Sequence, residues 1–168
     1  MKQIKFLSML LFLAATATFM SCDKEDNPSD PGNTGGGSTT PKTVNITYSV
    51  GDMRDMTELV DVTVEYNDST GTKVTEQSIS LSWEKNLKDV KTPVTAKLIV
   101  RYKAKEGVTY DKEAYRISRD VRLSVTTPDD KNIYQSSPLN LTISKDKIAD
   151  YIKEYLENKP DSISVDCK

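Results

Sequence analysis

Histidine is absent from this chain of 168 residues, and the sequence holds only two cysteines and a single tryptophan. Without histidine the chain cannot carry out Ser-His-Asp hydrolysis, Cys-His proteolysis or zincin-type metal catalysis. Two cysteines provide neither a disulfide framework nor a four-cysteine zinc site. The 23 basic and 25 acidic residues give a formal charge of −2, so the basic surface that nucleic-acid binding requires is missing as well. We therefore predict no catalytic residues, no cofactor, no metal site and no nucleic-acid partner.

The scarce residue types are unevenly distributed along the chain. All three phenylalanines lie in the first 20 residues, and four of the seven glycines lie between residues 28 and 41. The part from residue 44 onward holds all eight tyrosines and the tryptophan. This length suits one ordinary domain with an extension. We therefore divide the chain into residues 1–21, 22–43 and 44–168.

The first segment, residues 1–21, is organised like a signal peptide. Lys2 and Lys5 precede an apolar run that extends from Phe6 to Met20. A run of about 15 residues is shorter than the roughly 20 that a membrane-spanning helix needs, and no basic stop-transfer cluster follows it. We therefore predict a secretory signal that is removed from the mature protein.

The run ends in a small residue followed by a cysteine, Ser21-Cys22, which resembles the lipobox of bacterial lipoproteins. The resemblance implies that Cys22 carries a diacylglycerol on its sulfur, becomes the first residue of the mature chain and is acylated on its amine. Two or more acyl chains anchor a protein stably to a membrane. The alternative is an ordinary secretory signal cut near Ala17 or Ser21.

A short charged motif, Lys24, Glu25 and Asp26, follows Cys22 almost directly. A lysine and two acidic residues at this place resemble the surface-export signal of Bacteroidota-type lipoproteins. The resemblance implies an outer-membrane lipoprotein that contacts the membrane through its lipid anchor and faces the cell exterior. The alternative is that these residues are only the polar start of a linker and that the domain faces the periplasm.

Residues 22–43 are predicted to be the lipidated cysteine followed by a flexible tether. The stretch 27–43 contains no apolar side chain that could start a core, and it is rich in glycine, serine, threonine and proline. As a flexible coil, residues 23–43 would span about 25 Å. A domain held in this way can reorient near the membrane, which suits a surface binder.

Residues 44–168 form the predicted domain, in which apolar and polar side chains alternate with the period of two that is typical of half-buried strands. We expect strands over residues 44–50, 60–66, 73–84, 94–104, 115–126, 133–135, 139–143 and 163–167. The apolar parity changes inside the third of these, which predicts a bulge or bend between residues 74 and 79. About seven strands with turn signals between them indicate a mainly β fold, an antiparallel β-sandwich of Ig-like or transthyretin-like form. The alternative is a small α+β domain with a single sheet.

One helix is expected before the last strand. Ser144 is a suitable N-cap, and Asn158-Lys159-Pro160 ends the helical pattern. The apolar stripe of this helix consists of Ile148, Tyr151, Ile152, Tyr155 and Leu156. We expect the helix to cover one end or one edge of the sandwich.

Three single residues bear on the interior of the domain. Trp83 shares the apolar parity of its strand, which favours a place in the core over an exposed sugar-binding platform. Arg119 lies on the apolar parity of its strand, where a continuous strand would bury it and require a paired carboxylate. We expect instead a bulge near residues 118–120 that turns Arg119 to solvent. Cys167 shares the apolar parity of the last strand, which predicts a buried thiol and a monomer.

Two short segments, Asp-Ser-Thr at 68–70 and Asp-Ser-Ile at 161–163, resemble the O-glycosylation motif of Bacteroidota proteins. The resemblance implies sugars on Ser69 and Ser162. Since Ser69 lies in the predicted hairpin turn, we expect it to be modified before Ser162.

The sequence leaves three classes of function open. The first is a non-catalytic binding or adhesion module for an extracellular glycan or protein, with the irregular stretches 52–58 and 105–115 as the loops to examine. The alternative is a structural or assembly component of the cell envelope. The third is an enzyme with no recognisable active site. Exposed aromatic side chains would favour the first reading, and a long unpaired edge strand with few charges would favour the second.

Overall fold

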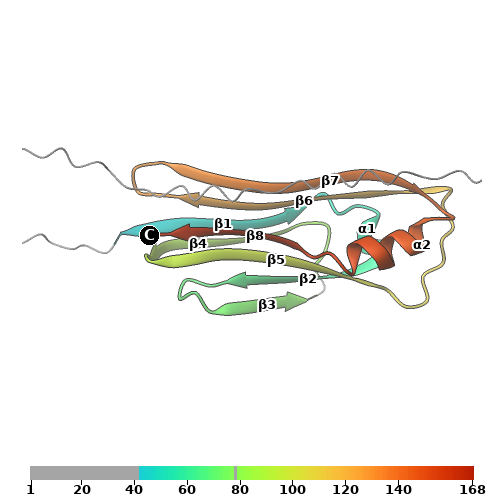
Figure 1. Ribbon diagram of the computed structural model, residues 1–168, viewed down its shortest axis with the longest axis horizontal. Coiled ribbons are helices and arrows are strands. Elements are labelled where there is room, and N and C mark those ends of the chain that lie inside the picture. Colours follow the sequence, from blue (N-terminus) through green and yellow to red (C-terminus); the bar gives the residue numbers. More distant parts are fainter. Residues whose placement is uncertain (1–41, 78) are drawn as a thin grey trace, which may run out of the picture. The chain divides into compact units, whose positions relative to one another are not determined.

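The computed structural model describes residues 42–77 and 79–168, and these form an antiparallel β-sandwich with two four-stranded sheets, as predicted (Figure 1). The strands are β1 (Thr43–Gly51), β2 (Val60–Asn67), β3 (Lys73–Gln77), β4 (Trp83–Lys91), β5 (Val94–Ala104), β6 (Ala114–Thr126), β7 (Asn132–Ser144) and β8 (Asp161–Cys167). One sheet has the order β4-β1-β6-β7 and the other β3-β2-β5-β8. A short helix α1 (Met56–Leu59) follows β1, and helix α2 (Ile148–Tyr151) continues into the π-helical turn η1 (Ile152–Leu156) before β8.

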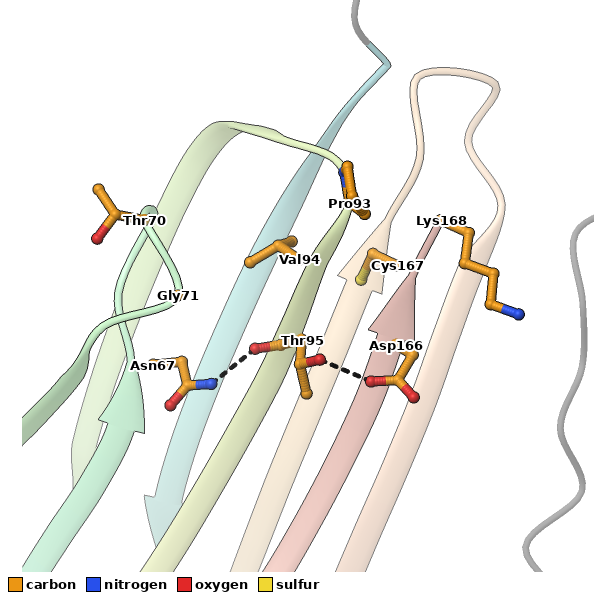
Figure 2. Close-up of a pocket in the computed structure, with 9 residues that line it drawn as sticks. All are labelled: Asn67, Thr70, Gly71, Pro93, Val94, Thr95, Asp166, Cys167 and Lys168. Carbon is orange, nitrogen blue, oxygen red and sulfur yellow. Dashed lines mark hydrogen bonds between the residues drawn. The ribbon is translucent and has the colours of Figure 1, made fainter.

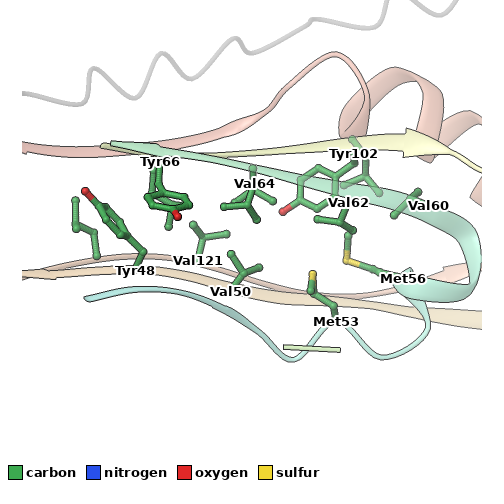
Figure 3. Packing of buried hydrophobic residues seen from close by; sticks show 14 of the residues in the cluster. Tyr48, Val50, Met53, Met56, Val60, Val62, Val64, Tyr66, Tyr102 and Val121 are labelled. Atoms are coloured by element: carbon green, nitrogen blue, oxygen red, sulfur yellow. The ribbon is translucent and has the colours of Figure 1, made fainter. Parts of the chain in front are cut away.

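Alternation of side chains builds the core between the two sheets. Tyr48 of β1 and Tyr66 of β2 face each other across the interior, with ring centroids 5.5 Å apart (Figure 3). Met53 and Met56, from the connection between β1 and β2, are fully buried beside the strands. Complete burial of each such side chain contributes about 1.5–3 kcal/mol. The period-two pattern of the sequence therefore does select the inward faces.

The predicted single strand over residues 73–84 is wrong, because the chain changes sheets there. β3 ends at Gln77 and pairs with β2, whereas β4 begins at Trp83 and pairs with β1 in the other sheet. The change of apolar parity that suggested a bulge or bend thus marks a crossing between layers. Conversely, the two separate strands expected over 133–135 and 139–143 are one continuous strand, β7.

The helix differs from the prediction at its start and on its exposed face. Ser144 is not an N-cap, because β7 runs through it and pairs it with Ala114. The helix begins only at Ile148, and its buried side chains are Ile148, Ile152 and Leu156. Tyr155 of the predicted apolar stripe is 49% exposed. Among the described residues, no helix is long and apolar enough to cross a membrane.

Arg119 points into the sandwich, and the predicted bulge at 118–120 is absent. The ladder between β6 and β7 runs without interruption, so the strand keeps its parity. Arg119 forms an ion pair with Asp161 at the start of β8, where the two side chains are 11% and 8% exposed. The hydroxyl of Tyr102 on β5 donates to the same carboxylate at 2.7 Å. The carboxylate that a buried arginine requires therefore comes from the other sheet, and the pair connects the two layers.

Candidate protein-binding edge

Each sheet of a sandwich ends in two edge strands whose outer backbone groups lack a partner strand. Here the edges are β4 and β7 in one sheet and β3 and β8 in the other. β4 has five charged residues among nine, β3 has two among five, and β8 has two among seven. β7 is the longest of the four with 13 residues, and none of them is charged. Charged side chains are a common device against unwanted strand pairing, and β7 alone lacks it.

Half of the backbone groups of β7 face away from β6. At the two ends of the β6–β7 ladder, the amide of Thr127 donates to the carbonyl of Lys131 at 2.9 Å, and the amide of Lys145 donates to the carbonyl of Glu113 at 3.0 Å. Hydrogen-bonded and non-hydrogen-bonded pairs alternate in an antiparallel ladder. Since both end pairs consist of odd-numbered residues, the even-numbered residues of β7 direct their backbone groups outward.

Pro138 interrupts this outward row of donors. It lies opposite Asp120 in the ladder, and as an even-numbered residue it faces the open edge. Proline has no backbone N–H, so the edge lacks one donor at its middle. The remaining outward donors fall into two groups, Asn132–Ser136 and Asn140–Ser144. Among the described residues, the only strand that pairs with β7 is β6.

The side chains of β7 also divide into two kinds. Leu139 and Ile143 point toward the interior and are half-buried, and Leu141, with the same parity, is 40% exposed. Tyr134 lies on the outer face, where it is 55% exposed and close to Arg122 of β6. The open edge is therefore bordered by an apolar row on the inner side and by polar side chains on the outer side.

The predicted lipidation and export residues, Cys22 and Lys24, Glu25 and Asp26, lie outside the described residues. Ser69 is exposed in the turn between β2 and β3. In that turn Asp68 accepts hydrogen bonds from Thr70, and these lower the pKa of its carboxyl group.

The second predicted glycosylation site has a different environment. Ser162 is exposed on β8, but the preceding Asp161 is buried in the pair with Arg119. The aspartate of this motif is therefore buried in the folded domain, whereas Asp68 is partly exposed. Sugars on Ser69 and Ser162, and the preference for Ser69, stay predictions.

The irregular stretches 52–58 and 105–115 meet at one end of the sandwich. Lys112 Nζ lies 3.1 Å from Asp55 Oδ1 and 2.7 Å from Glu58 Oε2. The backbone N–H of Arg116 donates to the other oxygen of Asp55 at 2.7 Å and is the main reason why the pKa of that carboxyl group is lowered. Hydrogen bonds to Glu58 and Asp55 raise the pKa of Lys112. These contacts fasten the two stretches to each other, which explains why charged residues gather there.

Trp83 and Cys167 lie close to where the sequence placed them. Trp83 packs against the core but is only half-buried, and its indole N–H donates to Glu76 at 2.7 Å. Its ring is 5.4 Å from that of Tyr66. Cys167 is 7% exposed, so the predicted burial of its thiol is confirmed.

A shallow pocket lies at the end of the sandwich where the chain ends (Figure 2). The amide of Asn67 donates there to the carbonyl of Thr95 at 2.9 Å, and the hydroxyl of Thr95 donates to Asp166 at 2.7 Å. These polar groups are already hydrogen-bonded to one another. In the described part of the chain, no group of three or more acidic or cysteine side chains could hold a metal ion.

No family model, no curated protein and no solved structure matches this chain. The most distinctive feature of the described residues is the open edge of β7. Sequence reasoning named an uncharged edge strand as a discriminating feature but did not locate it. The signal was the stretch 132–144, which contains no charged residue.

Proposed function

We propose that this protein is a membrane-anchored lipoprotein of the cell surface that binds a protein partner, without catalysing a reaction, along the open edge of β7. The observation that carries the proposal is a 13-residue edge strand without a charged side chain. Main-chain hydrogen bonds to an added strand supply affinity, and flanking side chains supply specificity. Such an edge serves a binding module and an envelope-assembly component alike, and in both cases the partner is a protein.

The proposed anchor and the proposed edge occupy different parts of the sheet. The carbonyl of Lys42, just before β1, accepts a hydrogen bond from the backbone N–H of Thr92 at 3.0 Å. β1 therefore starts beside β4, and β6 separates it from β7. A lipid on Cys22, followed by the export signal Lys24, Glu25 and Asp26, would hold the domain on the cell exterior by a strand that is not the binding strand.

A glycan is the second candidate partner, because Tyr134 is exposed beside Arg122. The other exposed aromatic side chain of the described residues, Tyr155, lies on η1. Tyr134 and Tyr155 lie on different elements, and the ring that stacks on Tyr155, that of Tyr151 at 5.3 Å between centroids, is half-buried. The open edge is thus the stronger of the two observations.

Photo-crosslinking in the native cells tests the proposed function. A photoreactive amino acid replaces Thr142 on β7, and in a matched strain it replaces Asn86 on β4, the opposite edge of the same sheet. We expect one discrete protein adduct from position 142 and not from 86, and we expect Asn140→Lys to abolish it because a charge then borders the edge. Equal adducts from both edges, or an adduct that persists with Asn140→Lys, would contradict the proposal.

The anchor and the sugars have their own tests. Cys22→Ala should leave the protein soluble and unlipidated, so that it no longer partitions with detergent-extracted membranes. Scrambling residues 24–26 should reduce the digestion of the protein by protease on intact cells. Ser69→Ala should lower the intact mass by one glycan, with a smaller effect from Ser162→Ala. A native mass equal to that of the lipidated polypeptide would exclude O-glycosylation.

A further inference from the structure

We infer that the protein partner of the β7 edge is a second copy of this chain, and that the two copies pair antiparallel over residues 140–144 about a two-fold axis at Thr142. The inference rests on the protein-binding function proposed above and names its partner and register. Two four-stranded sheets would thereby join into one continuous sheet. This dimer departs from the monomer that the buried thiol of Cys167 predicts, because the strands join without a disulfide.

Pro138 limits where a second strand can pair with β7. Within a sheet, proline is tolerated at the open side of an edge strand, because it lacks the N–H that a neighbouring strand would bind. Pro138 has this position in β7, on the side away from β6. A partner strand that crossed residue 138 would turn it into a residue of a central strand. Pairing is therefore confined to residues 132–137 or to residues 139–144.

The side chains favour the half of β7 that follows the proline. Its inward row is entirely apolar and consists of Leu139, Leu141 and Ile143. Leu141 is 40% exposed although its parity points inward. In the other half the corresponding row contains the polar residues Gln135 and Ser137. Apolar side chains gain most where they cover apolar surface, so pairing is favoured over residues 139–144.

The outward backbone groups determine the register within this half. The even-numbered residues Asn140, Thr142 and Ser144 direct their N–H and C=O groups away from β6. Two opposite residues of an antiparallel pair exchange two hydrogen bonds when both direct these groups at each other. A two-fold axis at Thr142 places Asn140 of each copy opposite Ser144 of the other. This register uses all three residues and leaves Pro138 outside the pairing.

The same register also matches the side chains of the two copies. On the inner border Leu141 of each copy lies opposite Ile143 of the other, in a non-hydrogen-bonded pair, where side chains approach most closely. Leu141 thus covers apolar surface of the second copy and loses the exposure that it has in a single copy. On the outer border Thr142 lies opposite its own copy, and cross-strand threonine pairs are favourable.

The absence of charge distinguishes a second copy from a foreign strand. Near a two-fold axis a side chain faces its own copy, so a charge there would repel itself. A foreign strand sets no such condition, because it can carry the opposite charge. In a chain with 29% charged residues, all 13 residues of β7 are uncharged, whereas each other edge strand carries at least two charges. Self-pairing requires this neutrality, and pairing with a foreign strand does not.

A second copy also supplies a strand that is already formed and closes the assembly. β7 is held by β6 along its whole length, so its backbone needs no ordering, whereas an extended foreign segment would have to be ordered on binding. Pairing uses the neutral edges of both copies. The joined sheet then ends in two copies of β4, with five charged residues among nine. Association therefore stops at two copies.

Sedimentation velocity of the full chain tests the inference. The Cys22→Ala variant is used, so that no lipid can bring two chains into one detergent micelle, and it should show a monomer–dimer equilibrium. In this background Asn140→Lys and Ser144→Asp should each weaken the dimer about tenfold or more, because each places an unpaired charge against the other copy. An equimolar mixture of the two should recover the dimer, because the introduced charges then lie opposite each other.

Ser136→Asp provides the matched control. It introduces the same charge as Ser144→Asp but in the half before the proline, so by itself it should leave the dimer unchanged. Mixed with Asn140→Lys it should not bring that variant into dimers, since residue 136 is not opposite residue 140. Circular dichroism spectra of each variant verify that the sandwich is folded.

Several results would overturn the inference. These are a monomer at every concentration, a dimer that Asn140→Lys leaves unchanged, or recovery of Asn140→Lys by Ser136→Asp instead of Ser144→Asp. In the crosslinking experiment described above, we expect an adduct from position 142 with twice the mass of the chain. An adduct with a protein of different mass would contradict the second copy and leave the proposed function standing. Absence of any adduct would contradict the proposed function itself.

Discussion

The two long sides of the sandwich are closed by different means. On the β3/β4 side the exposed edge strands carry charges such as Glu84, Lys88 and Lys91, and half-buried Trp83 bridges to Glu76. On the β7/β8 side the ion pair of Arg119 and Asp161 lies inside, and β7 presents no charge outside. The β3/β4 side therefore carries charged residues on its exposed edge strands, whereas the β7/β8 side is stabilised by a buried ion pair between the two sheets.

This comparison explains how a neutral edge can coexist with a stable fold. A charge on the outer border of β7 would discourage a partner strand, but the side still needs polar contacts that connect the two sheets. The Arg119–Asp161 pair provides such contacts without using the edge, and Ser137 of β7 lies 3.4 Å from the same carboxylate. The polar connection between the sheets and the proposed binding edge are thus separated.

The largest effect on the free energy of unfolding should come from breaking the buried ion pair of Arg119 and Asp161. Asp161→Ala leaves the Arg119 charge buried without its carboxylate and should lower the free energy of unfolding by about 3–5 kcal/mol, measured by urea denaturation. The matched control is Asp166→Ala on the same strand, where an exposed carboxylate accepts one hydrogen bond and the loss should stay below about 1 kcal/mol. The double variant Arg119→Met, Asp161→Leu should recover most of the loss. Equal losses from Asp161→Ala and Asp166→Ala would remove the distinction between the two sides.

A second prediction concerns Pro138, which interrupts the row of outward N–H groups along β7. Pro138→Thr restores an outward N–H, so two copies regain two hydrogen bonds where their β7 strands pair across position 138. The self-association constant should rise about 25-fold, which sedimentation velocity measures. Ser136→Thr is the control, because Ser136 already has its N–H. An unchanged self-association constant for Pro138→Thr would show that the missing N–H of Pro138 is not what limits the pairing of two β7 strands.

On the β3/β4 side, loss of the hydrogen bond between Trp83 and Glu76 should lower the free energy of unfolding less. Trp83→Phe keeps an aromatic ring against Tyr66 but removes the hydrogen bond to Glu76, and it should cost about 1 kcal/mol in thermal or urea unfolding. A loss as large as that of Asp161→Ala would show that this side also depends on an interior polar contact.

The smallest effect is confined to alkaline pH. Burial, and then the charge of Asp161, raise the pKa of Tyr102 strongly above its ordinary value of 10.0, while burial and a hydrogen bond to Glu76 raise that of Tyr66. Because both values are higher in the folded state, the related stability is complete below pH 10 and is lost as the pH rises above it. In a spectroscopic tyrosinate titration, Tyr66→Phe should remove an earlier step than Tyr102→Phe. The reverse order would contradict the stronger upward shift of the Tyr102 pKa, to which the charge of Asp161 contributes.

The sequence predicts those features that depend on local alternation. The apolar parity of residues 60–66 and 94–104 identifies the inward faces of β2 and β5, and the class of fold follows from such strands. Alternation does not specify which sheet a strand joins, so the crossing between Gln77 and Trp83 looked like one irregular strand. The helix start was missed for a similar reason, since pairing with Ala114 extends β7 through Ser144.

The candidate edge could be predicted only in part from the sequence, because the contacts of its polar residues are with residues far away along the chain. Gln135 and Ser137 interrupt the apolar alternation of β7, and this made one strand look like two. Ser137 is polar at an inward position because it contacts Asp161, 24 residues away. Arg119 likewise finds its carboxylate 42 residues along the chain, in the other sheet. Pairings at such separations are set by the tertiary fold.

The place where the tether joins β1 determines how the domain would bear mechanical tension. With the proposed lipid at Cys22 and a proposed partner strand at the Ser144 end of β7, the pull would enter at Thr43 and leave near the opposite end of the same sheet (Figure 1). It passes through seven register pairs between β1 and β6 and thirteen between β6 and β7. The force runs along the strands, so these bonds are loaded together in shear and do not open one after another as in a zipper. The second sheet lies outside this load path and is free to keep the core closed while the first one is under strain.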